Sequence, residues 1–300
     1  MRGMTSTGNN DPQDAPQSRN RAKASRREAM RTQMLQQQAA ARRKERMRLI
    51  GGVVLVLVVI AAIAIGITVA NRNNDDTAAP SGPAGTGVIS AITDVPASVV
   101  DTVGKGTSAA APTALSGAPA LTADGKPRVL YVGAEFCPYC AAERWSVVNA
   151  LSRFGTFTGL GQTSSSSSDS YPNTATLSFH GASYTSDYLS FTGVEETDRD
   201  QHPLDTLSDA DSKIFKTYNP QGGIPFIDYG GRFTSSGAGY DPQVLQGKTH
   251  QQIADALKDP SSDITKAVVG QANVLTATLC QLTDQKPAAV CTAPGVKAAA

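Results

Sequence analysis

The chain has 300 residues, of which 40% are hydrophobic and 18% charged, enough for one large or two modest domains if all of it folded. Its formal net charge of +1 identifies no class of partner, because the charges are unevenly distributed. Residues 1–48 carry 12 Lys/Arg and 4 Asp/Glu, a net charge of +8, whereas the remaining residues carry 15 and 22.

Residues 49–71 contain no charged side chain and predict a transmembrane helix. At about 1.5 Å per residue this run reaches about 33 Å, enough to cross a bilayer core of about 30 Å. A buried core helix and a cleavable signal peptide are the alternatives, but a leader of 48 residues is long for a signal peptide. Because positive charge stays inside, we expect a single-pass protein with a cytoplasmic amino terminus and an extracytoplasmic remainder.

The basic cytoplasmic arm, residues 1–48, predicts contact with a lipid membrane, since each cation near anionic lipid contributes about 1 kcal/mol. Nucleic-acid binding is the alternative for such a charged arm. No aromatic or folded recognition element accompanies the charge, so we expect no nucleic-acid partner.

Beyond the membrane segment, residues 72–86 are rich in Asn, Asp, Pro and Gly and predict a flexible linker. A folded domain is expected over 87–258, followed by a C-terminal helix and tail over 259–300. A short helix at 98–103, ended by Gly104, precedes another loose stretch that extends to about Gly117.

The apolar run at 127–136 predicts a strand buried on both faces, and the next residues predict a helix that ends at Gly155. Cys137 and Cys140 therefore lie at a strand-to-helix junction. Further on, the patterns predict strands at 174–181 and 187–195, a helix at 209–218, a hairpin around Gly230-Gly231, and helices at 249–258 and 263–282.

The junction favours thiol chemistry. Cys137 precedes the helix, where unpaired N–H groups and the helix dipole stabilise its thiolate, and Cys140 lies one turn later, within reach of a mixed disulfide. Pro138 fits the first turn, which loses no hydrogen bond when an N–H is missing. We expect Cys137 to attack and Cys140 to resolve.

The segment "AEFCPYC", followed much later by "GGIPF", resembles the thioredoxin-like superfamily. The resemblance implies an α/β, thioredoxin-like fold in which Pro225 adopts the cis form opposite the redox pair. It also implies a substrate groove to which Ile224 contributes its backbone edge, beside Pro138 and Tyr139.

More closely, "VLYVGAEFCPYCAAERW" and "GGIPFIDYGG" resemble the uncharacterised domain-of-unknown-function family 929 of thioredoxin-like proteins from actinobacteria and archaea, over about 87–258. Two features depart from ordinary thioredoxins. Tyr131 replaces their buried acid, so proton transfer to Cys140 needs another group, for which Glu135 or water is the candidate. The long separation between Cys140 and Pro225 implies an insertion over 156–210 that sets partner choice.

Three other interpretations of the cysteines are open. Cys137 and Cys140 could bind zinc with Cys280 and Cys291, but the spacing of 11 in the second pair is unlike a zinc knuckle. Cys280 and Cys291 are expected to form a structural disulfide, with a second redox relay as the alternative. The first pair could also be a plain staple in a non-enzymatic binding module.

Histidine provides no competing site: His180, His202 and His250 have neither metal-ligand spacing nor a hydrolase motif. The sequence therefore predicts a membrane-anchored thiol-disulfide oxidoreductase that uses no metal or cofactor. Its expected partners are the thiols or disulfides of exported proteins and a membrane redox partner, and the direction of reaction stays open.

Overall fold

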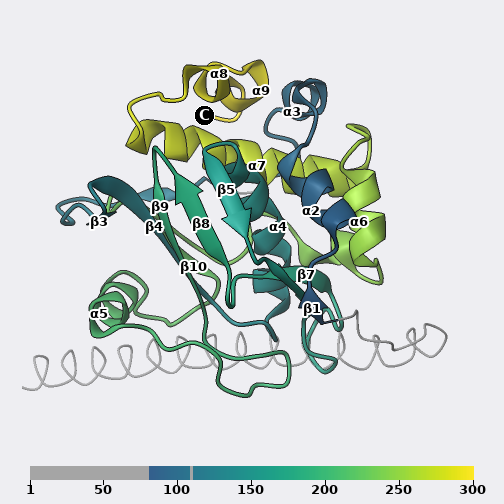
Figure 1. Cartoon of the computed structure of the whole chain (residues 1–300), viewed down its shortest axis with the longest axis horizontal. Helices are drawn as coiled ribbons and strands as arrows, with labels where there is room; N and C mark the ends of the chain where they lie inside the picture. Colours follow the sequence, from purple (N-terminus) through teal and green to yellow (C-terminus); the bar gives the residue numbers. More distant parts are fainter. Residues whose placement is uncertain (1–80, 109–110) are drawn as a thin grey trace, which may run out of the picture. The chain divides into compact units, whose positions relative to one another are not determined.

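A six-stranded sheet with β4 (Lys126–Gly133) near its centre organises the computed structural model, which describes residues 81–108 and 111–300 (Figure 1). On one side β4 pairs in parallel with β9, and on the other it pairs antiparallel with β10, which continues through β11 to β2. The short β3 pairs with the start of β4. These strands are β9 (Ser190–Glu195), β10 (Phe226–Tyr229), β11 (Phe233–Ser236), β2 (Thr113–Ala114) and β3 (Thr122–Ala123).

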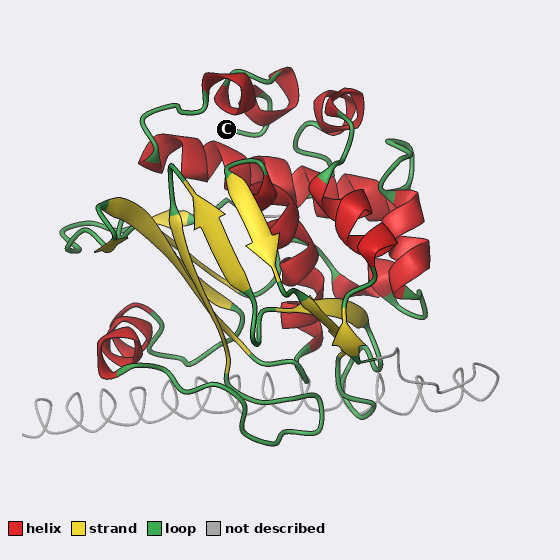
Figure 2. Cartoon of the chain, viewed as in Figure 1, coloured by secondary structure: helices red, strands yellow, loops and turns green. Residues whose placement is uncertain are grey.

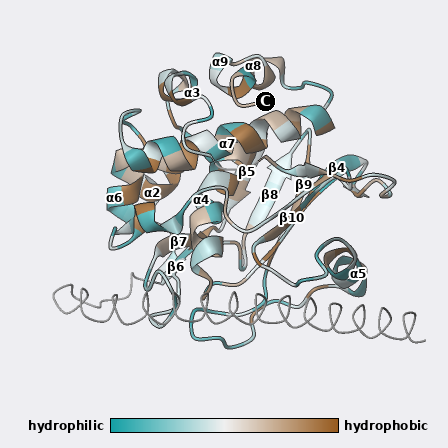
Figure 3. Ribbon diagram, turned by 180° about the vertical axis from the view of Figure 1, so that it is seen from behind, coloured by the Kyte–Doolittle hydropathy of each residue, from teal (hydrophilic) through white to brown (hydrophobic). Residues whose placement is uncertain are grey.

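Helices cover both faces of this sheet (Figure 2). Alternate residues of β4 point to opposite faces: Val129 and Tyr131 join the large core with α4 (Pro138–Ser152) and α7 (Asp263–Leu282), whereas Leu130 and Val132 pack toward α5 (Asp209–Tyr218). The strand is thus buried on both faces, as its continuous apolar sequence predicts. Hydrophobic residues are correspondingly prominent along β9 and β10 (Figure 3).

Four short strands separate α4 from β9 in the chain and form parts of two small sheets. β5 (Gly155–Thr158) pairs with β8 (Ser183–Ser186), and β6 (Gly161–Ser164) pairs with β7 (Ala175–Ser178). β1 (Gly82–Pro83) adds to the edge of β6. The additional strands therefore occupy 155–186, a shorter region than the predicted insertion over 156–210.

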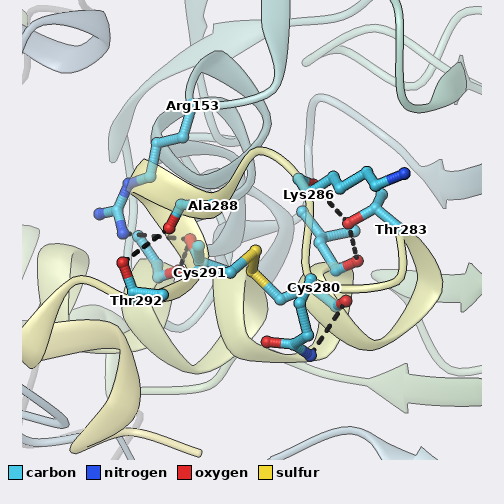
Figure 4. The surroundings of a disulfide bond; sticks show 11 residues. Arg153, Cys280, Thr283, Lys286, Ala288, Cys291 and Thr292 are labelled. Carbon is cyan, nitrogen blue, oxygen red and sulfur yellow. Dashed lines mark hydrogen bonds between the residues drawn. A yellow bond between two sulfur atoms is a disulfide. The ribbon is translucent and has the colours of Figure 1, made fainter.

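The carboxyl-terminal region packs on the same unit. α7 lies against α4. Beyond it, α8 (Ala288–Cys291) contacts α7, and α9 (Pro294–Lys297) contacts both α7 and α3 (Ala97–Val103). A disulfide joins Cys280 to Cys291 (Figure 4). The remaining helical segments are α2 (Thr86–Thr93), η1 (Pro242–Leu245) and α6 (His250–Ala256).

The first described residues, from 81 onward, form regular structure earlier in the chain than the sequence predicts. The predicted linker 72–86 is wrong at its end, because Gly82 and Pro83 pair with β6 and α2 begins at Thr86. Within the described residues no helix is long and apolar enough to cross a membrane. The predicted membrane segment, 49–71, and the basic arm lie outside the described residues.

Removing the Cys280–Cys291 disulfide should destabilise the fold. Replacing both cysteines by serine should lower the free energy of unfolding by about 2 to 3 kcal/mol, because the open chain gains entropy in the unfolded state. Urea denaturation measures this difference. Wild type with a reductant is the matched control and should unfold like the double variant under the same reductant, since Cys137 and Cys140 are then reduced in both proteins. Equal stability of wild type and variant without reductant would contradict a structural role.

Candidate active site

Cys137 and Cys140 lie where β4 ends and α4 begins. Cys137 is the residue that caps α4, with an extended backbone, and its Sγ accepts a hydrogen bond from the Cys140 N–H at 3.2 Å. Pro138 occupies the first turn of the helix. Both cysteines are free thiols, and the helix start provides the donor that one sulfur needs as an anion.

Cys137 is more enclosed than a helix start suggests. Only 5% of its surface is exposed. The Ile224 carbonyl oxygen lies 3.7 Å from its Sγ, at a cis Ile224–Pro225 peptide bond immediately before β10. Because β10 pairs directly with β4, residues 87 positions apart meet at the sulfur.

The two thiols differ in acidity. The hydrogen bond with Cys140 lowers the pKa of Cys137, assisted by Arg144 and opposed by burial. Burial raises the pKa of Cys140 well above its usual value, and the neighbouring Cys137 adds to this shift. Cys137 is therefore the more acidic of the two thiols and forms the nucleophilic thiolate more readily than Cys140 does.

A buried ion pair lies behind the pair of thiols. Arg144 donates from Nε and Nη2 to the two carboxylate oxygens of Glu195 at 2.8 and 2.6 Å, and neither side chain has any exposed surface. Nη2 also donates to the Ala134 carbonyl at 2.7 Å. One guanidinium group thus joins helix α4 to strand β9 and to the loop before Cys137.

Tyr131 completes this buried group. It has no exposed surface, and the Arg144 guanidinium carbon lies 6.0 Å from the centre of its ring. Gly133, two residues further along the same face of β4, provides the space for the Tyr131 ring and hydroxyl: a Cβ there would lie 2.5 Å from the hydroxyl oxygen. The position of the Tyr131 side chain therefore requires a residue without a side chain at position 133.

Glu135, the predicted proton-transfer residue, is half-buried, and Ser178 Oγ donates to its carboxylate. Its backbone N–H donates to the Thr197 carbonyl at 2.9 Å. None of its hydrogen bonds to described residues reaches Cys140. Arg144, by contrast, lowers the pKa of Cys140, and Cys140 in turn raises the pKa of Tyr131.

Among the large hydrophobic residues that the structure describes, Tyr139 is exposed, with 42% of its surface accessible. Its ring makes an edge-on contact with Tyr171, with ring centres 6.1 Å apart. Tyr171 belongs to the loop between β6 and β7, and Ser166 in that loop donates to the Phe136 carbonyl at 2.9 Å. The segment between α4 and β9 therefore reaches the site, beside a predicted substrate contact.

Sequence reasoning overlooked Arg144, Glu195 and Tyr171. A signal for Arg144 was present, since an arginine four residues after Cys140 shares its helix face. Glu195 ends a strand otherwise assigned only by its alternating pattern, and the partnership spans 51 residues, so no local signal joins the two.

Comparison with known protein families identifies one family to which the sequence is similar. The family model described as Domain of unknown function (DUF929) matches residues 115–281, more than half of the chain. The chain belongs to this family. No curated protein and no solved structure is detectably similar to it.

The DUF929 match includes both site cysteines, the buried ion pair and Pro225, but it ends ten residues before Cys291.

The second cysteine pair, Cys280 and Cys291, lies far from Cys137 and Cys140. Arg232 Nη1 donates to the carbonyl of Gln281, next to Cys280, and Gly230 donates to Arg128 near the start of β4. The five residue steps from there to Gly133 span about 16 Å of strand. This separation disfavours both direct relay and a shared zinc site.

Metal-ligating side chains do not gather elsewhere in the region that the structure describes: no group of three or more His, Cys, Asp or Glu residues is arranged to hold an ion. His180 instead pairs with Asp205, His202 with Asp198, and His250 lies buried against the carbonyls of β6 and β7.

Gly133→Ala should destabilise this DUF929 domain by about 1 to 3 kcal/mol, because its methyl group would overlap the Tyr131 ring and hydroxyl in a packed core. Gly87→Ala is the matched control, since a Cβ at Gly87 meets only one side-chain atom, at 4.0 Å, and alanine favours the helix α2. Urea denaturation of both variants tests this. Equal stability of Gly133→Ala and wild type would show that Tyr131 can move aside.

Proposed function

We propose that this chain is a membrane-anchored, extracytoplasmic thiol-disulfide oxidoreductase with a thioredoxin-like fold, acting on exported proteins. The observation that carries the proposal is the set of contacts made by Cys137. Its sulfur accepts a hydrogen bond from the Cys140 N–H at the start of α4, and it faces the Ile224 carbonyl. A thiolate with a second thiol one turn away is the arrangement that disulfide exchange needs.

The strand arrangement supports the thioredoxin-like part of the proposal. Four neighbouring strands run in the order β9, β4, β10, β11, with β9 parallel to β4 and each of the others antiparallel to its neighbour. Helix α4 follows β4 directly, and helices lie on both faces. In this order the segment before β10, with Pro225, meets the helix start with Cys137.

The chemistry proceeds by two exchanges. The Cys137 thiolate bonds to one sulfur of a substrate disulfide and expels the other, which takes up a proton. Cys140 then loses its proton, bonds to Cys137 Sγ and expels the second substrate sulfur, which is protonated in turn. The substrate gains two electrons and two protons, and the pair becomes a disulfide. The reverse sequence oxidises a substrate dithiol.

The location rests on the amino-terminal sequence. An uncharged stretch at 49–71 preceded by a strongly basic arm supports a single span with the redox domain outside the cytoplasm. An oxidising compartment also fits a domain that carries a disulfide in its tail.

A second candidate is a non-enzymatic binding module, which the low exposure of both thiols favours. The two candidates differ in redox behaviour. The reduction potential of the Cys137–Cys140 pair, measured in glutathione buffers by mass spectrometry after alkylation, should lie between about −270 and −120 mV for a working site. A pair that resists reduction below about −300 mV would support a staple instead.

Cysteine variants should separate the two proposed roles. Cys137→Ser should abolish exchange with a model disulfide, because the attacking sulfur is lost. Cys140→Ser should retain the first exchange and accumulate a mixed disulfide on Cys137. Mass spectrometry of the quenched reaction detects the adduct. Retained exchange in Cys137→Ser, or an adduct on Cys140, would contradict the assignment.

A further inference from the structure

Two polar atoms behind the redox pair lack the partners that buried groups normally have. Tyr131 Oη and Arg144 Nη1 are both buried in side chains without exposed surface, and neither is hydrogen-bonded to any residue that the structure describes. A buried polar group without a partner costs about 1 to 3 kcal/mol, more when charged, so such atoms call for an explanation.

The orientation of the Arg144 guanidinium shows which of its nitrogens is available to a further partner. Its Nε and Nη2 atoms face the Glu195 carboxylate, so Nη1 is the nitrogen left free by the ion pair. Arg144 follows Cys140 by four residues on α4, which places the two side chains on the same face of the helix, one turn apart. Cys140 has no exposed surface, so this charge acts on its sulfur without screening by water.

Tyr131 approaches the same thiol from β4. The space above Gly133 lets its hydroxyl extend toward the end of the strand, where the chain turns into α4. Burial raises the pKa of Tyr131 well above its usual value, and both cysteines add to that shift. The hydroxyl therefore keeps its proton and can donate it in a hydrogen bond.

We propose that Arg144, together with the Tyr131 hydroxyl, stabilises the thiolate of Cys140 in the step that forms or breaks the Cys137–Cys140 disulfide. This inference rests on the proposed function. A charged Cys140 sulfur accepts hydrogen bonds much more strongly than a neutral thiol does, and it is the partner that both donors lack in the resting state.

In this step Cys140 gives up its proton, its sulfur bonds to Cys137 Sγ, and the bond between Cys137 and the substrate sulfur breaks. The departing substrate sulfur takes up a proton. In the reverse direction Cys140 is the leaving group and carries away the electron pair of the broken disulfide. Arg144 lowers the barrier both ways, because the charge on Cys140 Sγ is present in both.

The groups that act electrostatically on Cys140 are Cys137, which caps α4, Arg144 on α4 and Tyr131 on β4. Glu195 on β9 acts on it through its ion pair with Arg144. Glu195 neutralises part of the field of Arg144 and lies on the far side of the guanidinium from Nη1. The two members of the ion pair should therefore have opposite effects on the thiol, which a purely structural pair would not have.

The test titrates Cys140 alone. In the full-length chain with Cys137→Ser, the tail disulfide leaves Cys140 as the one thiol among four cysteines, so the pH dependence of the nuclear magnetic resonance shift of a carbon-13 label at cysteine Cβ reports the pKa of this thiol apart from the tyrosines. Adding Glu195→Gln should lower the pKa of Cys140. Adding Arg144→Met and Glu195→Gln together should raise it by about one unit, a tenfold loss of thiolate at a given pH. Arg144→Lys, which keeps the charge, should stay close to the parent.

Shifts of the same sign in Glu195→Gln and in the double variant, or no shift in either, would overturn the inference. If the double variant fails to unfold cooperatively, the decision falls on Glu195→Gln, which retains Arg144 and an acceptor for it; an unchanged or raised pKa there is enough to reject the role.

A kinetic measurement links this titration to exchange. With Cys137 restored, the lifetime of its mixed disulfide with glutathione should lengthen about tenfold in the double variant and shorten in Glu195→Gln, at a pH below the pKa of Cys140. If wild type forms no mixed disulfide, the proposed function fails while the titration still reports on Arg144. Normal exchange with unshifted titrations would reject the role of Arg144 alone.

Discussion

The buried ion pair between Arg144 and Glu195 is the constraint on which the site depends. Bringing two charges out of water costs several kcal/mol per ion, which good geometry and further hydrogen bonds must offset. The pair is bidentate and the guanidinium also binds the Ala134 carbonyl, which leaves Nη1 as the one guanidinium nitrogen without a partner among the described residues. Because that carbonyl belongs to the loop before Cys137, the same contact fixes how α4 leaves β4.

Helix α4, which follows this loop, contacts several other parts of the domain. Its polar side chains are buried and each anchors a different segment: Trp145 donates to the Ala175 carbonyl, Ser146 to that of Val268 and Asn149 to that of Ile92. A helix surrounded in this way has little freedom to tilt. The thiols at its start are therefore positioned by contacts to β7, α7 and α2, regions that the chain supplies long before or after them.

Local patterns in the sequence predicted the elements that they determine. The apolar run before Cys137, the Gly230-Gly231 turn and the helix at 263–282 all form as expected, because burial on both faces, a positive backbone φ and helical periodicity are encoded within a few residues. The short strands β5, β6 and β8 were not predicted, since pairing between distant segments stabilises them. The Arg144–Glu195 pair was missed for the same reason, and the enclosure of Cys137 arises from Ile224 on a remote segment.

The distribution of the four cysteines has a consequence for how the chain matures. Four thiols can pair in three ways, and only one of them joins Cys280 to Cys291 while leaving the other two free to pair. Once β4 has taken its place in the sheet, its length separates the two pairs and excludes the crossed pairings. The folded sheet thus keeps Cys137 and Cys140 away from the tail cysteines, so the tertiary structure itself selects which cysteines can pair.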